Sequence, residues 1–376
     1  MTDIRQYGAV LDGLSDDTSA WMGAIIAAQN GDRVVTMPPG TSLVRDHNQD
    51  GFALLVKDIP IRIVGAGRGA SKIRLANGRN CHLFQFENLR GGGTLSDLTL
   101  DGNRSHQTAG HALRGKGWDR MRIERVEILN AWGHAMTLYE GSFKDVLVRD
   151  CVARDCGGSG LDIRNLDGGN RNLLVRGMRV RKFGLNPGNS VAAVNLRGPG
   201  IIRDTFVSDM GTTSSGLIGI RVFATDGSEI GGNQSVIDGF QIYALVKNGT
   251  RGVELNGFQC VVRDGFVQGC SQGVRVNQIG NVIRNVQAQN CTDAFDIQSD
   301  DSILSACHAT SCTRAFYTNR QNTQFVGCGA KLSGYSFFMD AAAVYTRIIG
   351  GYSLSPTSGH IGGTGTNTVE TNLLKR

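Results

Sequence analysis

Apolar and polar positions recur in one frame of 21 residues between residues 250 and 340. One column of this frame is apolar and holds Val253, Val274, Phe295, Phe316 and Phe337. A second column is polar and holds Asn256, Asn277, Gln298, Asn319 and Asp340, and a third holds Cys270, Cys291 and Cys312. The alternation inside each repeat is typical of short β-strands stacked coil on coil. Three strands and three turns fill 21 residues and leave no room for a helix in every repeat.

This spacing predicts an all-β chain that forms a single-stranded right-handed parallel β-helix, a solenoid. Equivalent residues on successive coils would lie about 4.8 Å apart, and the hand follows the rule for parallel crossover connections. The amide column can donate and accept hydrogen bonds along the axis, as a ladder of turns. The cysteine column fits small side chains that fill the core, and a redox or metal column is the alternative.

The frame continues toward the N-terminus with wider spacing. Two apolar residues, usually followed by Arg and then a turn residue, recur with turn positions at Asp150, Gly177, Asp204, Asp238, Asp264 and Asn285. The steps between these positions are 27, 27, 34, 26 and 21 residues. The extra residues flank one strand on both sides, so we expect loops that wall its outer face and form a binding groove. Loops that only thicken a subunit interface are the alternative.

The first 45 residues follow a different pattern. Residues 15–31 are predicted to form a helix, because Ser15 or Asp16 can cap its start, acidic residues stand in its first turn, and Gly31 can end it. Such a helix would cover the first coil of a solenoid. The predicted division is an N-terminal cap at 1–45, the parallel β-helix at 46–355, and a C-terminal cap or tail at 356–376.

Composition narrows the class of protein. The 376 residues include 52 Gly and 6 Pro, which favours tight turns between short strands. The net charge of +6 permits an acidic partner and does not indicate nucleic acid. No secretory signal and no run of 18 apolar residues is present, so neither signal-directed export nor a membrane span is expected. The nine cysteines lack zinc spacing, so we expect reduced thiols, no metal and no cofactor.

The segment at 161–164 carries the main candidate for chemistry. Alternation points Leu161 and Ile163 inward, so Asp162 and Arg164 point outward. The outward column that includes Asp162 is expected to hold Thr137, Asp162, Ala193, Arg221, Glu254, Arg275 and Asp296. Its alternating charges fit a surface charge ladder at Arg275 and Asp296. Asp162 has no charged partner in this column.

Carboxylates from neighbouring loops are expected close to Asp162. One loop carries Asp167, and another carries Asp226 and Glu229. Glycoside hydrolysis needs one protonated and one ionised carboxyl group, about 5 to 9.5 Å apart. Asp162, Asp226, Glu229 and Glu254 are therefore the candidate catalytic residues of a hydrolase.

A lyase would need a different set of groups, namely a base and a cation that neutralises a sugar carboxylate. His134, Tyr139 and the two arginines at 164 and 221 could supply them. The candidates for binding substrate are Arg164, Asp167, Arg221, His134, Tyr139 and Trp132. Trp118 and Trp132 could be platforms for sugar rings or could pack in the core.

The opening segment QYGAVLDGLSDDTSAWMGAIIAAQ, followed by VVTMPPGTSLV, resembles the start of pectate-lyase-superfamily β-helix proteins, including phage tailspikes. TLDGNR at 99–104 and GGSGLDIRN at 157–165 are similar to coils of that superfamily. The resemblance implies polysaccharide recognition, often by a homotrimer. The superfamily contains lyases, hydrolases, epimerases, fructotransferases and binding spikes, and this chain carries none of the known lyase signatures.

The expected function is a phage or prophage spike that binds and depolymerises a bacterial surface polysaccharide, such as a capsule, an exopolysaccharide or an O-antigen. Such a spike would be made in the cytoplasm, would act on the virion after lysis, and could attach through an adaptor protein. A free-standing carbohydrate-active enzyme, such as a lyase or fructotransferase, is one alternative. A non-catalytic receptor-binding spike is another. Neither nucleic acid nor a membrane is an expected partner.

Overall fold

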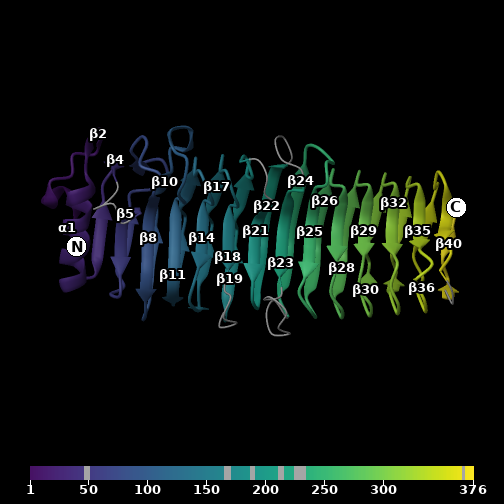
Figure 1. Cartoon of the computed structure of the whole chain (residues 1–376). Helices are drawn as coiled ribbons and strands as arrows, with labels where there is room; N and C mark the ends of the chain where they lie inside the picture. Colours follow the sequence, from purple (N-terminus) through teal and green to yellow (C-terminus); the bar gives the residue numbers. More distant parts are fainter. Residues whose placement is uncertain (46–50, 165–170, 187–190, 211–215, 224–233, 366–368) are drawn as a thin grey trace. The chain divides into compact units, whose positions relative to one another are not determined.

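The computed structural model describes residues 1–45, 51–164, 171–186, 191–210, 216–223, 234–365 and 369–376. The chain divides into two compact units, Met1–Asn189 with Ala193–Asn195, and Ser190–Ala192 with Leu196–Arg376. Each unit is built from parallel strands wound into coils (Figure 1). The fold is the predicted single-stranded right-handed parallel β-helix. Among the described residues, no helix has the length and apolar character needed to cross a membrane.

Each coil of the first unit gives one longer strand to one sheet and two short strands to another. For example, β8 (His82–Leu89) is followed by β9 (Gly93–Ser96) and β10 (Thr99–Asp101). The strands that this unit gives to the first of these sheets are β5 (Phe52–Lys57), β8, β11 (Leu113–Asp119), β14 (Met136–Tyr139) and β18 (Leu161–Arg164), each paired in parallel with the next. Three strands per coil are what the repeat length predicts.

A buried aromatic cluster holds these strands from the inside. It consists of Trp21, Phe84, Phe86, Trp118 and Phe143, whose neighbouring rings lie 4.6 to 6.4 Å apart. Trp118 is therefore a core residue and not a platform for sugar, and its Nε1 donates to the Phe86 carbonyl. Gly115 must lack a side chain, because a Cβ there would lie 2.1 Å from the Trp118 ring. The core thereby fixes the inner face of the strands whose outer face carries the candidate site.

The cap helix α1 (Thr18–Asn30) begins three residues later than predicted. Asp16 lies at the end of a strand, β2 (Asp12–Asp16), and its Oδ1 accepts hydrogen bonds from Thr18 N and Oγ1 at 3.1 and 2.6 Å. The first turn of the helix contains no acidic residue, which contradicts the prediction. Asp17 stands at the cap position but accepts from the backbone of Val10 at 2.8 Å, so it holds the preceding segment. Gly31 ends the helix as predicted.

The strands near both ends of the chain join the ladders of their units. In the first unit, β3 (Val34–Met37) pairs with β6 (Arg62–Gly65), and β4 (Gly40–Val44) pairs with β7 (Ser71–Leu75). In the second unit, β38 (Gly359–Gly363) pairs with β35 (Tyr335–Met339). The predicted cap and tail segments thus contain paired strands. The boundaries at 45 and 355 stay a prediction.

The second unit shows the 21-residue frame directly. Val253 lies beside Val274, and Val274 lies beside Phe295, as the repeat predicts. The rings of Phe295, Phe316 and Phe337 stack with centroids 5.0 Å apart. One sheet of this unit contains β23 (Ile218–Phe223), β25 (Arg251–Asn256), β27 (Gln272–Val276), β29 (Asp293–Ile297), β32 (Arg314–Thr318), β35 (Tyr335–Met339) and β38. Longer strands, such as β22 (Gly200–Met210) and β24 (Val236–Ala244), belong to the other sheet.

The turn positions and the cysteines largely follow the predicted frame. The structure pairs Arg203 with Asp238, so Gly239 and not Asp238 is the turn residue opposite Asp204. Both Asp204 and Gly239 have a positive φ, which Asp and Gly tolerate best. All nine cysteines lie in the described residues, are buried and form no disulfide, and burial raises the pKa of the Cys270 thiol to about 12. The cysteines therefore fill the core.

Candidate functional site

A cleft of about 280 Å³ opens over the outer face of β11, β14 and β18 in the first unit. We call it the histidine cleft, and it is lined by His82, His111, Arg114, His134, Thr137, Tyr139 and Arg164. Three of the predicted substrate-binding residues meet here, namely His134, Tyr139 and Arg164. Successive coils bring them together: Tyr139 and Arg164 lie side by side on paired strands.

Three imidazole rings stack along one wall of the cleft. The ring centroids are 5.0 Å apart between His82 and His111, and 4.9 Å apart between His111 and His134. In each case Nδ1 accepts a hydrogen bond from the backbone N–H of the next coil. The donors are His111 N to His82 at 3.1 Å, His134 N to His111 at 2.9 Å, and Ser159 N to His134 at 2.9 Å. A backbone amide can only donate, so each Nδ1 must carry a lone pair.

This ladder fixes the protonation of all three rings. Burial lowers the pKa of His82 to about 4 and that of His111 to about 2, and it also lowers the pKa of His134. The rings are therefore neutral near pH 7. A neutral imidazole has one N–H, and Nδ1 is already an acceptor, so the proton sits on Nε2. The wall presents three Nε2–H donors without a positive charge of its own.

Arg114 lies beside the His82 ring, where two N–H donors face each other. Its Nη1 lies 3.3 Å from His82 Nε2. Both nitrogens carry protons, since the His82 tautomer is fixed and a guanidinium has no acceptor, so the two do not hydrogen-bond to each other. An oxygen of a ligand that lies in front of both nitrogens could accept a hydrogen bond from each. Arg114 also lies 5.8 Å from the centre of the Tyr139 ring, which extends this cationic wall toward the phenol.

Asp162 is buried and fully engaged: its column neighbours Thr137 and Asn195 are uncharged, as predicted, but charged and ionisable partners reach it from outside the column. Its residue is 1% exposed. Its Oδ2 accepts from Arg164 Nε at 2.6 Å and lies 3.3 Å from His134 Nε2, while Oδ1 accepts from Asn195 Nδ2 at 2.6 Å. The carboxylate therefore holds Arg164 and His134 in place and offers little to a substrate.

The outward column contains Asn195 where Ala193 was expected. Asn195 reaches Asp162 from β21 (Ala192–Arg197), whereas Ala193 is buried. A shift of two residues keeps the same face of a strand outward, so alternation alone could not separate the two registers. Because the loops differ in length, a constant repeat length could not be used to align the coils either.

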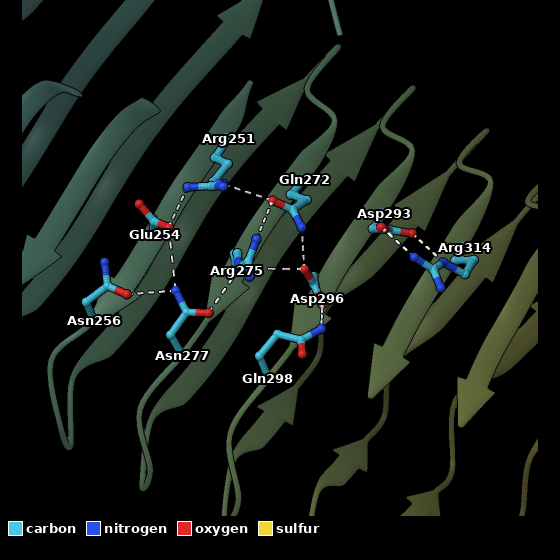
Figure 2. Close-up of polar contacts among 10 residues, drawn as sticks. All are labelled: Arg251, Glu254, Asn256, Gln272, Arg275, Asn277, Asp293, Asp296, Gln298 and Arg314. Carbon is cyan, nitrogen blue, oxygen red and sulfur yellow. Dashed lines mark hydrogen bonds and ion pairs between the residues drawn. The ribbon is translucent and has the colours of Figure 1, made fainter. Parts of the chain in front are cut away.

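The predicted catalytic residue Glu254 belongs to the second unit and has its own partners (Figure 2). Its Oε1 accepts from Arg251 Nη1 at 2.7 Å. The neighbouring Arg275 and Asp296 lie side by side and form the predicted ion pair, 3.9 Å between Nε and Oδ2, but Asp296 is only 2% exposed and burial raises its pKa, so this step of the ladder is buried. The amides of Gln272 and Gln298 donate to Asp296.

The amide column of the second unit forms its ladder only in part. Asn277 Nδ2 donates to Asn256 Oδ1 at 2.7 Å, as the sequence predicts. Gln298 instead turns toward Asp296 on its own strand (Figure 2). Between Arg251 and Arg314, the outer face of this unit is thus a network in which arginines, carboxylates and amides bind one another (Figure 2).

The other predicted site residues do not line the histidine cleft. Arg221 lies on β23 of the second unit, with its guanidinium 4.4 Å from the centre of the Phe223 ring. Trp132 is half-buried, and its carbonyl accepts from Asn186 Nδ2 at 2.7 Å. Three predicted residues, Asp167, Asp226 and Glu229, lie outside the described residues.

Sequence reasoning missed several residues of the cleft: His82, Arg114 and the stacking role of His111. The three histidines are separated by 29 and 23 residues, as the hydrogen bonds between coils record, and so fall outside a 21-residue search. A usable signal was present, because each histidine follows Cys or Gly and precedes Leu or Ala at the start of a coil. Within the described part of the chain, no three His, Cys, Asp or Glu side chains are arranged to hold a metal ion.

Sequence comparison finds related proteins over part of the chain. No protein-family model matches. A mannuronan C5-epimerase of Azotobacter vinelandii is 32% identical over 173 residues, which are 41% of this chain and 17% of that relative. An alginate lyase of the same organism is 33% identical over 174 residues, which are 42% of this chain and 20% of the relative. The chain therefore matches only about a fifth of the length of these relatives.

Solved structures share the fold over the whole chain. The A-module of a mannuronan C5-epimerase of Azotobacter vinelandii has a TM-score of 0.57 at 16% identity, and the match covers 100% of this chain and 99% of that one. The surface adhesin PfbA of Streptococcus pneumoniae has a TM-score of 0.56 at 12% identity, covering 97% and 91%. Tailspike protein 3 of bacteriophage CBA120 has a TM-score of 0.58 at 12% identity, covering 100% and 59%. These likenesses confirm the β-helix fold that the superfamily resemblance implied.

The histidine stack predicts a specific dependence of stability on pH. The folded pKa values of His82 and His111 lie below the usual value, so the unfolded chain binds more protons once the pH falls below about 6.5. Above that pH, protonation of these histidines should not lower the free energy of unfolding. This free energy should fall by up to about 1.4 kcal/mol per pH unit for each histidine as the pH drops toward 4.

Urea denaturation at pH 7.5 and pH 5 checks this expectation. His111→Asn keeps an acceptor for the backbone N–H and removes the titrating ring, so it should lose part of the difference between the two pH values. His106→Asn, which lies outside the stack, is the matched control. An equal pH effect in wild type and His111→Asn would contradict the assignment.

Proposed function

We propose that the chain is a carbohydrate-active β-helix protein whose histidine cleft binds a carboxylate of an acidic bacterial polysaccharide. The observation that supports this most is the 3.3 Å approach of two N–H donors, Arg114 Nη1 and His82 Nε2. The acceptors that Arg114 has within the protein are at long range, Gln85 Oε1 at 3.5 Å and Glu140 Oε1 at 3.8 Å. A carboxylate supplies acceptor oxygens in a geometry that guanidinium and imidazole N–H groups prefer. The names of the sequence relatives, a mannuronan epimerase and an alginate lyase, also point to polysaccharide substrates.

In this proposal one carboxylate oxygen sits between Arg114 and His82. The Nε2–H of His111, one ring further along the stack, takes the second oxygen. The neutral histidines avoid the repulsion that three imidazolium groups beside two guanidinium groups would cause. The fixed tautomers also mean that the donors are in place before the sugar arrives.

The same arrangement favours β-elimination over hydrolysis. A hydrolase needs a carboxyl group free to act as acid or nucleophile, and Asp162 is occupied by Arg164, His134 and Asn195. Neutralising a uronate carboxylate instead makes the proton on its C5 easier to remove. A base then takes the C5 proton, the C4–O4 bond breaks with its electron pair on O4, and O4 receives a proton. A double bond remains between C4 and C5.

Tyr139 is the group best placed to move that proton. It lines the cleft, and its hydroxyl has no hydrogen-bond partner within the described part of the chain. As a phenolate it can take the C5 proton, and as a phenol it can return one to O4, so no net proton is consumed. His134 is unsuited, because Nδ1 holds the Ser159 amide and the Nε2 proton faces Asp162.

A second candidate function is a phage or prophage spike that uses this cleft to recognise a host polysaccharide. The fold likeness to a bacteriophage tailspike over the full length of this chain supports it. Such a spike would be a homotrimer, would resist heat and detergent, and would sit on a virion through an adaptor protein after release by lysis. A free-standing enzyme would not attach to particles. Co-sedimentation with phage particles and light scattering of the purified chain separate the two.

Products of digestion are the first prediction of the proposal. Incubation with a panel of acidic and neutral bacterial polysaccharides should release unsaturated oligosaccharides from acidic polymers only. Mass spectrometry distinguishes these from products that have gained water. Products that have gained water would contradict the elimination and favour catalysis by carboxyl groups of the protein. Cleavage of neutral polymers would contradict the role of the sugar carboxylate.

Two variants separate binding from chemistry. Arg114→Ala should weaken binding of a uronate oligosaccharide by about tenfold or more, because it removes a charge-assisted hydrogen bond. Tyr139→Phe should leave binding within about threefold and lower kcat by about a hundredfold or more. Calorimetry and initial rates measure the two effects, and Arg320→Ala, an exposed change in the second unit, is the control. A Tyr139→Phe protein with the wild-type kcat would exclude the phenol from proton transfer.

A further inference from the structure

A larger cleft of about 560 Å³ lies on the first unit, where β5, β8 and β11 have ended. We call it the arginine cleft. Its lining includes four arginines, Arg33, Arg62, Arg120 and Arg122, and a single carboxylate, Asp58. It is separate from the histidine cleft: β8 begins at His82 in one and ends just before the glycines of the other. Eight residues of strand put the two clefts about 25 Å apart.

The arginines of this cleft lack the partners that arginines have elsewhere on the same unit. Arg125, Arg149 and Arg154 each bind a carboxylate of a neighbouring coil, at 2.6 to 3.0 Å. In the arginine cleft only Arg120 has an ion-pair partner, Asp119 at 3.8 Å. Within the described residues, the side chains of the other three have none. A cluster of unpaired guanidinium groups in a cleft raises the local concentration of anions.

Two of these arginines stand in one row along the axis of the coils. Arg62 pairs with Thr94, and Thr94 pairs with Arg122, so the three occupy the same position on successive coils. Two coil spacings separate the backbones of Arg62 and Arg122, which is about 9.6 Å, with a hydroxyl between them. A row of charges at regular intervals suits a linear polymer with regularly placed anionic groups better than one small anion.

The remaining walls of the cleft favour a sugar over a nucleic acid. Ile59, which is 36% exposed, and Pro60 form an aliphatic side. Gly91, Gly92 and Gly93 form the floor, and a Cβ at Gly93 would lie 2.9 Å from Met121 Sδ, so the floor stays low. Among the residues that the structure describes, no aromatic side chain lines the cleft, so unstacked bases would find no platform there. The C–H face of a pyranose ring can pack on Ile59 and Pro60.

We propose that the arginine cleft is a second binding site for an acidic polysaccharide and holds a carboxylate-bearing stretch of chain away from the histidine cleft. This inference rests on the proposed function, since it takes the same polymer as ligand. A long chain held at both clefts binds more tightly than at either alone, because the second contact is intramolecular. A trisaccharide is too short to span the two clefts and gains nothing from the second site.

Binding of sodium alginate and of an alginate trisaccharide tests the proposal. The double variant Arg62→Ala/Arg122→Ala should bind the polymer at least about tenfold more weakly than wild type, with a shallower dependence on salt. Its affinity for the trisaccharide and its kcat on that substrate should not change. The control Arg320→Ala/Arg347→Ala removes the same charge from exposed positions of the second unit and should bind the polymer as wild type does.

The outcomes separate this proposal from the function of the histidine cleft. If the arginine variant binds the polymer as tightly as wild type, or if wild type does not bind it, the second site is overturned. An equal loss of affinity for the polymer in the control variant would show that net charge explains the effect, and this result would also overturn the second site. Tighter binding of a single-stranded DNA oligonucleotide at these arginines would overturn the ligand class. If no polymer is cleaved but the arginine variant alone loses affinity, the second site stands and the lyase proposal fails.

Discussion

The candidate site depends on one repeated hydrogen bond, from the backbone N–H of each coil to Nδ1 of the histidine on the coil before it. His82, His111 and His134 all accept such a bond. Parallel stacking of coils makes the contact possible, because equivalent residues lie one strand spacing apart. The bond fixes the tautomer, burial keeps the rings neutral, and together they turn one wall into a row of N–H donors. Among the described lining residues, Arg114 and Arg164 then carry the positive charge of the cleft.

The balance of charge distinguishes the two units. In the second unit the outer face pairs Arg251 with Glu254 and Arg314 with Asp293, and planar amides satisfy what is left (Figure 2). In the first unit Arg114 faces a histidine proton and its ion pair with Glu140 is long, at 3.8 Å. Within the described residues, three of the four arginines of the arginine cleft have no ion-pair partner. Charges that the protein itself does not neutralise are where an anionic ligand has the most to contribute. Both proposals rest on this imbalance.

Much of the fold, and less of the site, could be predicted from the sequence. The 21-residue frame fixed the coil, because an apolar column such as Val253 and Val274 admits only one register when every loop has the same length. Where loop lengths vary, a shift of two residues leaves the alternation intact. The sequence pattern therefore predicted Ala193 beside Asp162, whereas the structure has Asn195 there. His82 joins the cleft through contacts between coils 29 residues apart, and its tautomer follows from a backbone contact that no sequence pattern encodes. His134, Tyr139 and Arg164 could be predicted as site residues, because they lie on or just before strands whose outward-pointing side chains follow from the alternation.

The central claim is that the three stacked histidines are neutral Nε2–H tautomers, and that two of them, His82 and His111, bind a sugar carboxylate. Nitrogen NMR of the imidazole rings, with ¹⁵N-labelled histidine and stepwise addition of a uronate trisaccharide, tests it most directly. The account predicts that His82, His111 and His134 are all Nε2–H tautomers at pH 7, and that the Nε2 signals of His82 and His111 shift as the ligand binds. A protonated ring, an Nδ1–H tautomer, or Nε2 signals that ignore a bound uronate would contradict it.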